Sequence, residues 1–227
     1  MNRLEHLRQT LVTNLRDSEK VKGIEFVLVD YGSSDGLESW VKSNMPPYLN
    51  LNRLVYFKTK PFKFFHHAHA KNIAHRLARG RIVCNIDADN YTGSGFAEYL
   101  MQIFSSRRKL IVRPPLNDCR KGTFGRIAMR KKDFELIGGY DEQLKFGWGH
   151  EDRDLSIRAL LMGMKLHFIP PYSPFLRAIE HGEMERTGHN RIKDKFKSRQ
   201  MHRDLSLRKI RKGTFIANEG KSWGSVK

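Results

Sequence analysis

One stretch decides the fold class: Arg81-Ile82-Val83-Cys84-Asn85-Ile86-Asp87-Ala88-Asp89-Asn90. Its first six residues include three β-branched apolar ones, so they predict a short strand, and two carboxylates follow it directly. A helix is predicted just before it, over residues 66–79, where apolar residues recur at helical spacing and Gly80 is placed to end it. Helix, then strand, then acidic residues is typical of α/β proteins, in which ligands bind beyond the carboxyl ends of the strands.

The residues before this stretch show the same alternation. Leucines at helical spacing predict a helix over residues 3–16, and residues 24–30 predict a strand that ends in a carboxylate. Residues 37–43 predict a second helix, stopped by Pro46-Pro47, and residues 54–57 predict a second strand. Strand, helix, strand, helix, strand predicts a parallel sheet with right-handed crossovers.

The second half of the chain is less regular. It predicts a helix over residues 131–137, a helix with an acidic first turn over residues 151–162, and a last strand over residues 166–169. Glycines gather in residues 122–125 and again at Gly138-Gly139. The chain shows no internal repeat, so we expect one globular unit rather than a solenoid.

Charge is concentrated at the C-terminal end of the chain. The 227 residues hold 42 Lys and Arg against 24 Asp and Glu, a net charge of +18, and residues 186–227 hold 13 against 3 of these. We therefore divide the chain into a main domain, 1–185, and a basic tail, 186–227. Such a tail is either a solvated helix or an attachment to an anionic membrane surface or polyanion.

Several broad classes are excluded by composition. With 39% hydrophobic and 29% charged residues, the chain is neither collagen-like nor disordered. Its two cysteines, Cys84 and Cys119, fit reduced thiols rather than a disulfide framework. No signal-peptide region follows Met1 and no apolar run approaches about 20 residues. We expect a cytoplasmic protein, with the tail drawn to the inner face of a membrane.

Asp87 and Asp89 are the first candidate site. Two carboxylates one residue apart at a strand end can turn toward a common ion, and hard oxygen ligands suit Mg²⁺ or Mn²⁺ shared with phosphates. Asp30 ends the earlier strand, so it is expected at the same edge of the sheet. The alternative is that the pair lies in a solvated turn, where Asp is common.

The second candidate site is Gly147-Trp148-Gly149-His150-Glu151-Asp152-Arg153-Asp154. Acids in a first helical turn complement the helix dipole, which explains any one of them as a cap. Capping does not explain an aromatic residue between two glycines. Trp148 is suited to form one wall of a pocket, with Glu151 and Asp152 at its floor, where a carboxylate can take a proton from a hydroxyl nucleophile.

Histidines form the remaining candidates. His181 follows the last strand, and it is either an exposed residue or a third ligand of a borderline metal. His66, His67 and His69 lie at a predicted helix start, where contact with phosphate or helix capping fits better than a zinc site.

Taken together, these groups resemble a known family. Val29-Asp30-Tyr31-Gly32-Ser33-Ser34-Asp35-Gly36 resembles the first nucleotide-site motif of family 2 glycosyltransferases, and the stretch from Asn72 to Asn90 resembles the approach to their acidic metal-binding triplet. Gly125-Arg126-Ile127-Ala128, Gly138-Gly139-Tyr140-Asp141-Glu142 and the Trp148 motif are similar to the galactosyltransferase and chondroitin N-acetylgalactosaminyltransferase type. The resemblance covers about residues 2–190.

The resemblance implies an α/β, GT-A nucleotide-diphospho-sugar transferase fold, with a Rossmann-like mixed sheet flanked by helices. It also implies roles for individual residues. Asp152 matches the catalytic base and Glu151 the acceptor-binding acid of the catalytic pair. Asp89, Asp87 and His181 match the ligands of a Mn²⁺ or Mg²⁺ ion. The residues that the resemblance implies for binding the nucleotide sugar are Asp30, Tyr31, Ser33, His67, Asn72, Asp87 and Trp148.

Two departures from the family pattern matter. Tyr31 stands where many members carry a second acid, so the base contact must come from elsewhere or from stacking on Tyr31. Members also carry an apolar strand just before the Asn-Arg that Asn2-Arg3 matches, and the given sequence starts at Met1. We therefore expect the strand that ends at Asp30 to face a gap, and the chain to be marginally stable.

The function implied is metal-dependent glycosyl transfer with inversion. The donor is a nucleoside-diphosphate sugar, of galactose or N-acetylgalactosamine type, and the acceptor is a hydroxyl of a glycan or lipid-linked molecule. One alternative is a module that binds polyanions or membrane surfaces without catalysis. Another is a metal-dependent phosphodiesterase, which the small number of clustered acids disfavours. No specific nucleic acid is expected as a partner.

Overall fold

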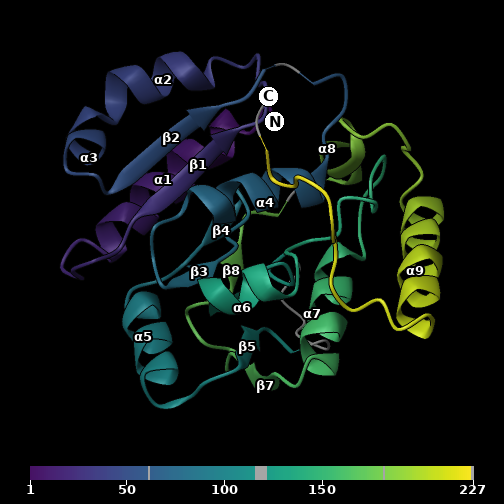
Figure 1. Ribbon diagram of the computed structural model, residues 1–227. Helices are drawn as coiled ribbons and strands as arrows, with labels where there is room; N and C mark the ends of the chain where they lie inside the picture. Colours follow the sequence, from purple (N-terminus) through teal and green to yellow (C-terminus); the bar gives the residue numbers. More distant parts are fainter. Residues whose placement is uncertain (61, 116–121, 181, 226–227) are drawn as a thin grey trace.

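Two sheets form the centre of the computed structural model (Figure 1). The structure describes residues 1–60, 62–115, 122–180 and 182–225. A cavity lies between the neighbouring edges of the two sheets. The first sheet pairs β1 (Phe26–Asp30) with β2 (Leu54–Lys58) in parallel. The second has the order β3 (Ile82–Cys84), β6 (Ala128–Arg130), β5 (Leu110–Arg113) and β7 (Lys165–Phe168). In it β6 runs antiparallel to both neighbours and β5 runs parallel to β7, so the sheet is mixed, as predicted.

The N-terminal helix α1 (Leu4–Asp17) covers the first sheet. Its leucine face packs against α2 (Leu37–Asn44) and against Leu54 of β2, so the helical spacing predicted the buried face correctly. The helix α2 ends at Asn44, before Pro46 and Pro47, as predicted. These prolines begin a further short helix, α3 (Pro46–Asn50), because the fixed φ of proline suits the first helical turn.

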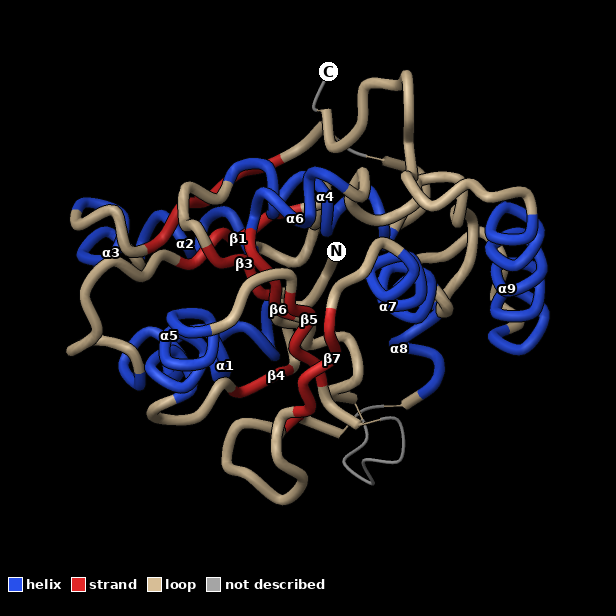
Figure 2. The backbone as a smooth tube through the Cα atoms, turned by 60° about the horizontal axis from the view of Figure 1, so that its bottom comes forward, coloured by secondary structure: helices blue, strands red, loops and turns tan. Residues whose placement is uncertain are grey.

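Helices cover both faces of the second sheet. On one face lie α4 (His67–Leu77), α6 (Lys131–Leu136) and α7 (Glu151–Leu161), and on the other lies α5 (Phe96–Ser106) (Figure 2). Successive residues of β5 alternate between the two cores: Ile111 packs in the first, and Leu110 and Val112 pack in the second. Burial on both faces is typical of a sheet enclosed by helices.

A cavity of about 880 Å³ separates the two sheets. Its walls include the continuous stretches 23–29 and 80–89, that is, β1 and β3 with their flanks, between α1 and α4. Among the described strands, β1 pairs only with β2 and β3 only with β6, so each has an open edge toward the cavity. The strand that ends at Asp30 therefore faces a gap, as expected.

A small sheet of β4 (Asn90–Tyr91) and β8 (Arg177–Ala178) lies beside α1. The tail forms α8 (Glu183–Thr187) and the long helix α9 (Lys195–Arg211), which lies on the outside of α7 (Figure 1). Within the described ranges, no helix has both the length and the apolar character to cross a membrane.

The basic tail is closely attached to the rest of the chain. Three polar side chains of α9 bond to other elements: Ser198 and His202 to the loop before α7, and Ser206 to α7 itself. After α9, the chain returns across the molecule, and the amide of Asn218 donates to the carbonyls of Gly138 and Tyr140. These hydrogen bonds attach residues 186–227 to the main domain. They do not test the domain boundary at residue 186, which stays a prediction.

Candidate active site

The N-terminus of α7 brings the two predicted catalytic acids against a buried lysine. The Nζ of Lys71, from α4, donates to Oδ1 of Asp152 at 2.7 Å and to Oε1 of Glu151 at 3.2 Å. The same ammonium lies 5.1 Å from the centre of the Tyr140 ring. All three charged side chains are at most 15% exposed, so this is a buried ion triad rather than a solvated cap.

The triad separates the pKa values of its two carboxyls. Burial raises the pKa of Asp152 to about 7, and the nearby charges of Glu151 and Asp87 act in the same direction, although Lys71 opposes them. Burial also acts to raise the pKa of Glu151, but Lys71 and then His67 outweigh it and lower that pKa to about 2. Glu151 is therefore ionised at neutral pH, while Asp152 can exchange a proton there.

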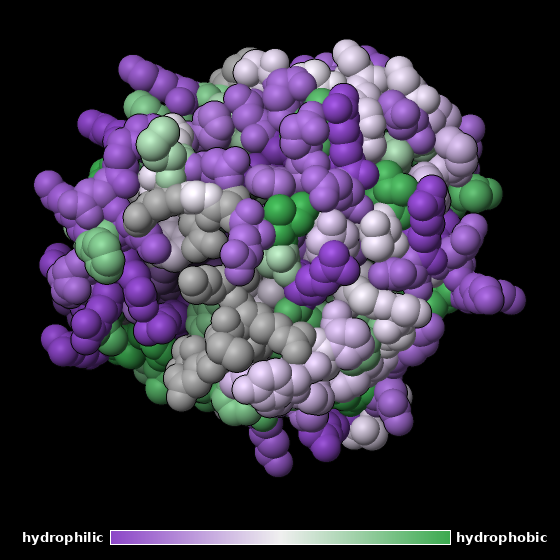
Figure 3. Space-filling view, turned by 180° about the vertical axis from the view of Figure 1, so that it is seen from behind, coloured by the Kyte–Doolittle hydropathy of each residue, from purple (hydrophilic) through white to green (hydrophobic). Residues whose placement is uncertain are grey.

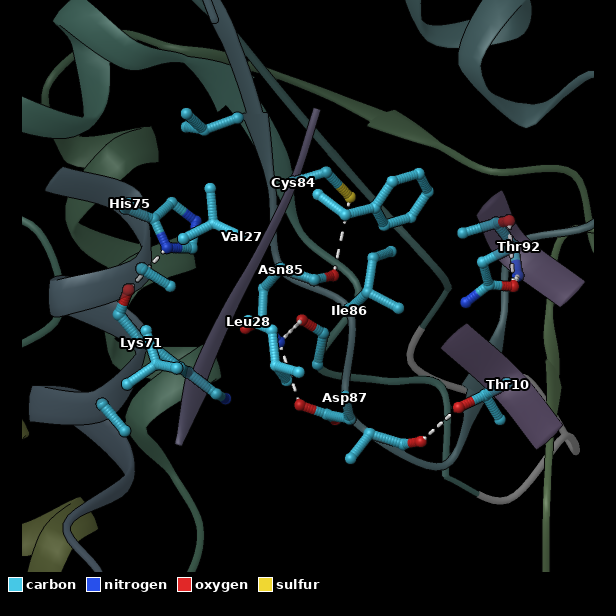
Figure 4. A pocket seen from close by; sticks show the side chains of 18 of the residues that line it. Thr10, Val27, Leu28, Lys71, His75, Cys84, Asn85, Ile86, Asp87 and Thr92 are labelled. Atoms are coloured by element: carbon cyan, nitrogen blue, oxygen red, sulfur yellow. Dashed lines mark hydrogen bonds between the residues drawn. The ribbon is translucent and has the colours of Figure 1, made fainter. Parts of the chain in front are cut away.

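Asp87 reaches the same point from the other side of the cavity. The amide of Asn85 donates to Asp87 Oδ1 at 3.0 Å and to the carbonyl of Gly125 at 3.0 Å, which orients the carboxylate (Figure 4). A Cβ on Gly125 would lie 2.8 Å from Asp87 Oδ2 and 3.2 Å from Asp152 Oδ2. The two carboxylates thus both approach Gly125, closely enough that only glycine fits at this position.

Asp89 lies on the next turn of the same segment. Its Oδ1 accepts from the amide of Asn90 at 2.8 Å, and its carbonyl accepts from Ile179 N at 2.8 Å. The second bond holds the segment after β8 beside the acidic triplet, which is the arrangement that a third ligand from that segment requires. His181, the predicted third ligand, lies outside the described residues.

The carboxylates of the acidic segment supply part of the ligand set that a hard divalent cation needs. Asp87 and Asp89 supply carboxylate oxygens, and both residues line the cavity. Among the residues that the structure describes, no group of three His, Cys, Asp or Glu side chains could hold a metal alone. A complete site therefore needs a further ligand, from the chain beyond these residues or from a bound diphosphate.

A buried arginine balances the acidic segment. Arg126 donates to Asn90 Oδ1 at 3.1 Å, and its guanidinium lies 5.4 Å from the centre of the Phe96 ring. Burial lowers its pKa to about 10, and the charges of Asp87 and Asp89 act against that shift. Its positive charge is therefore retained at neutral pH close to both predicted metal ligands.

The Trp148 loop is positioned by α9. Ser198 Oγ donates to the carbonyl of Trp148 at 2.9 Å and accepts from its N–H at 3.2 Å, and His202 Nδ1 lies 2.7 Å from the carbonyl of Gly149. A Cβ on Gly147 would lie 2.2 Å from the Ser198 Cβ, which explains the glycine at that position. Trp148 lines the same cavity as Glu151 and Asp152, as predicted.

The predicted nucleotide residues at the end of β1 bond to one another. Asp30 accepts from the N–H of Ser33 and from the hydroxyl of Tyr56, both at 2.7 Å. Ser33 Oγ in turn accepts from Asn2 N at 3.0 Å. The carboxylate is thus at the predicted edge of the sheet, with a defined orientation, although it does not line the cavity.

Tyr31 does not offer a face for stacking on a base. It is 2% exposed, its ring stacks on Phe62 with centroids 4.6 Å apart, and its hydroxyl bonds His69 Nδ1 at 2.8 Å. Phe62 is 39% exposed and is the ring of this pair that reaches the surface. The stacking role considered for Tyr31 is therefore wrong for this conformation.

Two other predictions need correction in their chemistry. Asn72 is fully buried, and it binds the backbone N–H and carbonyl of Tyr140 and the carboxylate of Glu142, so it joins α4 to the 139–142 turn instead of lining the cavity. His67 does line the cavity, with Nε2 3.2 Å from Asn190 Oδ1. Burial lowers its pKa, so it meets a ligand as a neutral imidazole rather than as a cation.

Sequence reasoning missed Lys71 and Asn85. Each lies one or two residues from a predicted site residue, but neither is acidic or part of a metal-ligand pattern. The sequence held one signal, and it concerned Lys71. This lysine lies on a helix that faces the predicted sheet edge, where a buried cation needs a partner of opposite charge.

Known proteins match this chain in one segment of sequence and in fold. Residues 117–187 match a family model described as the N-terminal domain of galactosyltransferase. No curated protein matched the sequence in the search. Solved structures do match: GalNAc-T7 with UDP, GalNAc and Mn²⁺ aligns with a TM-score of 0.60 at 17% identity, over 73% of this chain and 40% of that one.

Staphylococcal TarS gives a similar result. S. aureus TarS 1–349 aligns with a TM-score of 0.58 at 16% identity, over 80% of this chain and 59% of its own, and its UDP complex aligns with 0.57 at 16% identity, over 78% and 59%. The chain thus spans about two fifths to three fifths of the solved structures that it matches. The chain thus has the fold of the GT-A glycosyltransferases, and its residues 117–187 match the galactosyltransferase family model.

Proposed function

We propose that the chain transfers a sugar from a nucleoside diphosphate to a hydroxyl acceptor, with inversion at the anomeric carbon. One observation carries the proposal: the carboxylates of Asp87 and Asp152 both lie against Gly125, on the wall of a cavity that Trp148 also lines. The acid that we assign to the donor side and the acid that we assign to the acceptor side are thus neighbours. Galactose or N-acetylgalactosamine is the sugar favoured by the family match over residues 117–187.

Asp152 is suited to remove the acceptor proton. The acceptor oxygen forms a bond to the anomeric carbon while the bond from that carbon to the diphosphate oxygen breaks, and the hydroxyl proton passes to Asp152. A pKa of about 7 places this carboxyl near the operating pH, where general bases are most effective. Glu151, ionised at this pH, remains free to accept a hydrogen bond from the acceptor.

Lys71 keeps the two acids in place during this step. It donates to both carboxylates before transfer, and when Asp152 becomes neutral the ammonium still has Glu151 as its counter-charge. The triad therefore gains a proton without leaving any charge unpaired.

Asp87 and Asp89, with a third ligand of which His181 is our prediction, would hold Mn²⁺ or Mg²⁺. When bound, such a cation neutralises the charge that develops on the departing diphosphate. Asn85 and Asn90 orient these carboxylates through the hydrogen bonds described above.

A donor screen tests the proposal. The purified chain is incubated with UDP-galactose, UDP-N-acetylgalactosamine and UDP-glucose, and release of UDP is followed with Mn²⁺ and with EDTA. We expect release from at least one donor that needs the metal. If the chain binds none of these donors or UDP with Mn²⁺ present, yet binds heparin with a steep salt dependence, the polyanion-binding alternative is correct.

A further inference from the structure

A row of arginines runs from the second sheet to the outer helix beside the proposed site. It consists of Arg113 at the end of β5, Arg153 on α7, and Arg199 and Arg203 on α9. Within the described ranges, none of the four has an Asp or Glu oxygen within 4.0 Å. They are therefore unlike the arginines that form structural ion pairs elsewhere, such as Arg158 with Asp154 at 2.8 Å.

The arginines lie close enough to repel one another. Burial lowers the pKa of Arg153, and the charges of Arg199 and Arg203 lower it further. Burial and the charge of Arg153 likewise lower the pKa of Arg113. Arg113 and Arg153 both lie on the Phe124 ring, with guanidinium carbons 4.5 and 5.6 Å from its centre.

The row opens onto the proposed acceptor side of the cavity. Arg153 and Arg199 line that cavity together with Trp148 and Asp152. The stem of Arg199 packs against Gly149, where a Cβ would meet it at 3.6 Å, and Lys195 places its ammonium 5.1 Å from the centre of the Trp148 ring. Hydrophilic side chains gather on this side of the molecule, which carries α9 (left in Figure 3).

Asp152 acts as a counter-charge on Arg113, raising its pKa against the effects of burial and Arg153. Charges of one sign held together without an ion-pair partner raise the free energy of the folded chain, and a bound anion removes that cost. Guanidinium groups present paired N–H donors that match the oxygens of carboxylate, sulfate and phosphate groups. The diphosphate of the donor is expected instead at the proposed metal ligands, Asp87 and Asp89, which also line the cavity.

We propose that Arg153, Arg199 and Arg203 form a subsite for an anionic group of the acceptor, which is accordingly a glycan bearing a carboxylate, sulfate or phosphate. This inference rests on the proposed function, because it names the acceptor class for the same site. The half-buried position of Arg153 and Arg199 on the cavity wall favours a discrete group entering the cavity over a flat membrane surface.

The test compares two triple variants with the same loss of charge. One is R153Q/R199Q/R203Q, and the matched control is R208Q/R211Q/K212Q, whose exposed side chains lie at the far end of α9. Each protein, with Mn²⁺ and UDP, is titrated with an unsulfated chondroitin hexasaccharide, a chondroitin sulfate hexasaccharide, a mannose 6-phosphate disaccharide, and the uncharged counterpart of each. UDP affinity and binding to vesicles with 30% phosphatidylserine are measured in parallel.

We expect at least one anionic probe to bind the unaltered chain about tenfold more tightly than its uncharged counterpart, and this preference to be lost only in the first variant. UDP affinity should be the same in all three proteins. Equal losses in both variants, a loss of UDP affinity in the first variant alone, or no preference for any anionic probe would overturn the subsite. If the unaltered chain binds no UDP, the proposed function fails as well, so the two failures are distinguishable.

Discussion

The substitution Lys71→Met tests whether the ion triad at the N-terminus of α7 supports the fold as well as the site. It removes the ammonium that lies 2.7 Å from Asp152 and 3.2 Å from Glu151, and it keeps most of the aliphatic stem. Removing one partner of a buried pair leaves an uncompensated charge and costs about 3–5 kcal/mol. For a chain of this size we expect Tm to fall by about 6–20 °C.

The pH dependence of that loss follows from the two carboxyls. A pKa lowered to about 2 means that Glu151 stabilises the fold above its usual value of 4.5, and that this contribution fades as pH falls toward 2. Asp152 behaves in the opposite way, since a pKa raised to about 7 gives stability at low pH that is lost as pH rises through 7. Without Lys71 both groups favour the protonated form, so the deficit of the variant should be smaller at pH 5 than at pH 8.

Lys42→Met is the control for this measurement. Lys42 lies at the same 2.7 Å from a carboxylate, that of Glu38, but its side chain is 70% exposed, and such pairs contribute at most about 1 kcal/mol. Thermal unfolding of the three proteins at pH 5 and pH 8 provides the data. If Lys71→Met loses no more stability than Lys42→Met, the triad is not the buried ion pair described above.

Two further predictions concern the metal segment and the cavity between the sheets. Asp89→Ala should abolish Mn²⁺-dependent binding of UDP in a folded protein, because it removes one of the two proposed carboxylate ligands; unchanged affinity by calorimetry would refute that role. An apolar, β-branched segment of about ten residues fused ahead of Met1, which lines the cavity, should pair with the open edges of β1 and β3 and raise Tm by about 4 °C or more, together with nucleotide affinity. The same segment with alternating prolines cannot pair and should leave Tm unchanged; an equal rise with both segments would show that the open edges are not the binding site.

Local patterns predicted much of the fold. The leucines of α1 and the apolar spacing of α4 identified the buried faces of these helices. Residues three or four apart in sequence lie on the same face of a helix, so the pattern can be recognised from the sequence alone. The strands β5 and β6 were not predicted, since runs of four and three residues carry too short a pattern, and burial on both faces of the sheet removes the alternation. The end of α2 before Pro46 was predicted, but the short helix α3 that begins at Pro46 was not, although proline also begins helices.

The candidate site was predictable where a motif is continuous in sequence. Asp87 and Asp89 follow the end of β3, and the Trp148 loop precedes the start of α7. All three residues line the cavity, as these positions suggest. The bond from Lys71 to Asp152 joins residues 81 positions apart, and the convergence at Gly125 joins three segments, so both depend on the packing of the whole chain. The positions of Asn72 and Tyr31 also depend on the packing of the whole chain. The motifs suggested that both residues bind a ligand, but both are buried and contact other residues of the protein.

Asp152 is proposed to remove the acceptor proton in a sugar transfer at this cavity. The most direct measurement is the rate of sugar transfer by Asp152→Asn, at saturating donor and Mn²⁺, beside donor affinity measured in the same preparation. We predict unchanged donor affinity and a rate about 10²–10⁴ lower, because the amide keeps the shape of the side chain and cannot accept the proton. A variant that transfers sugar at nearly the unaltered rate would show that Asp152 is not the base.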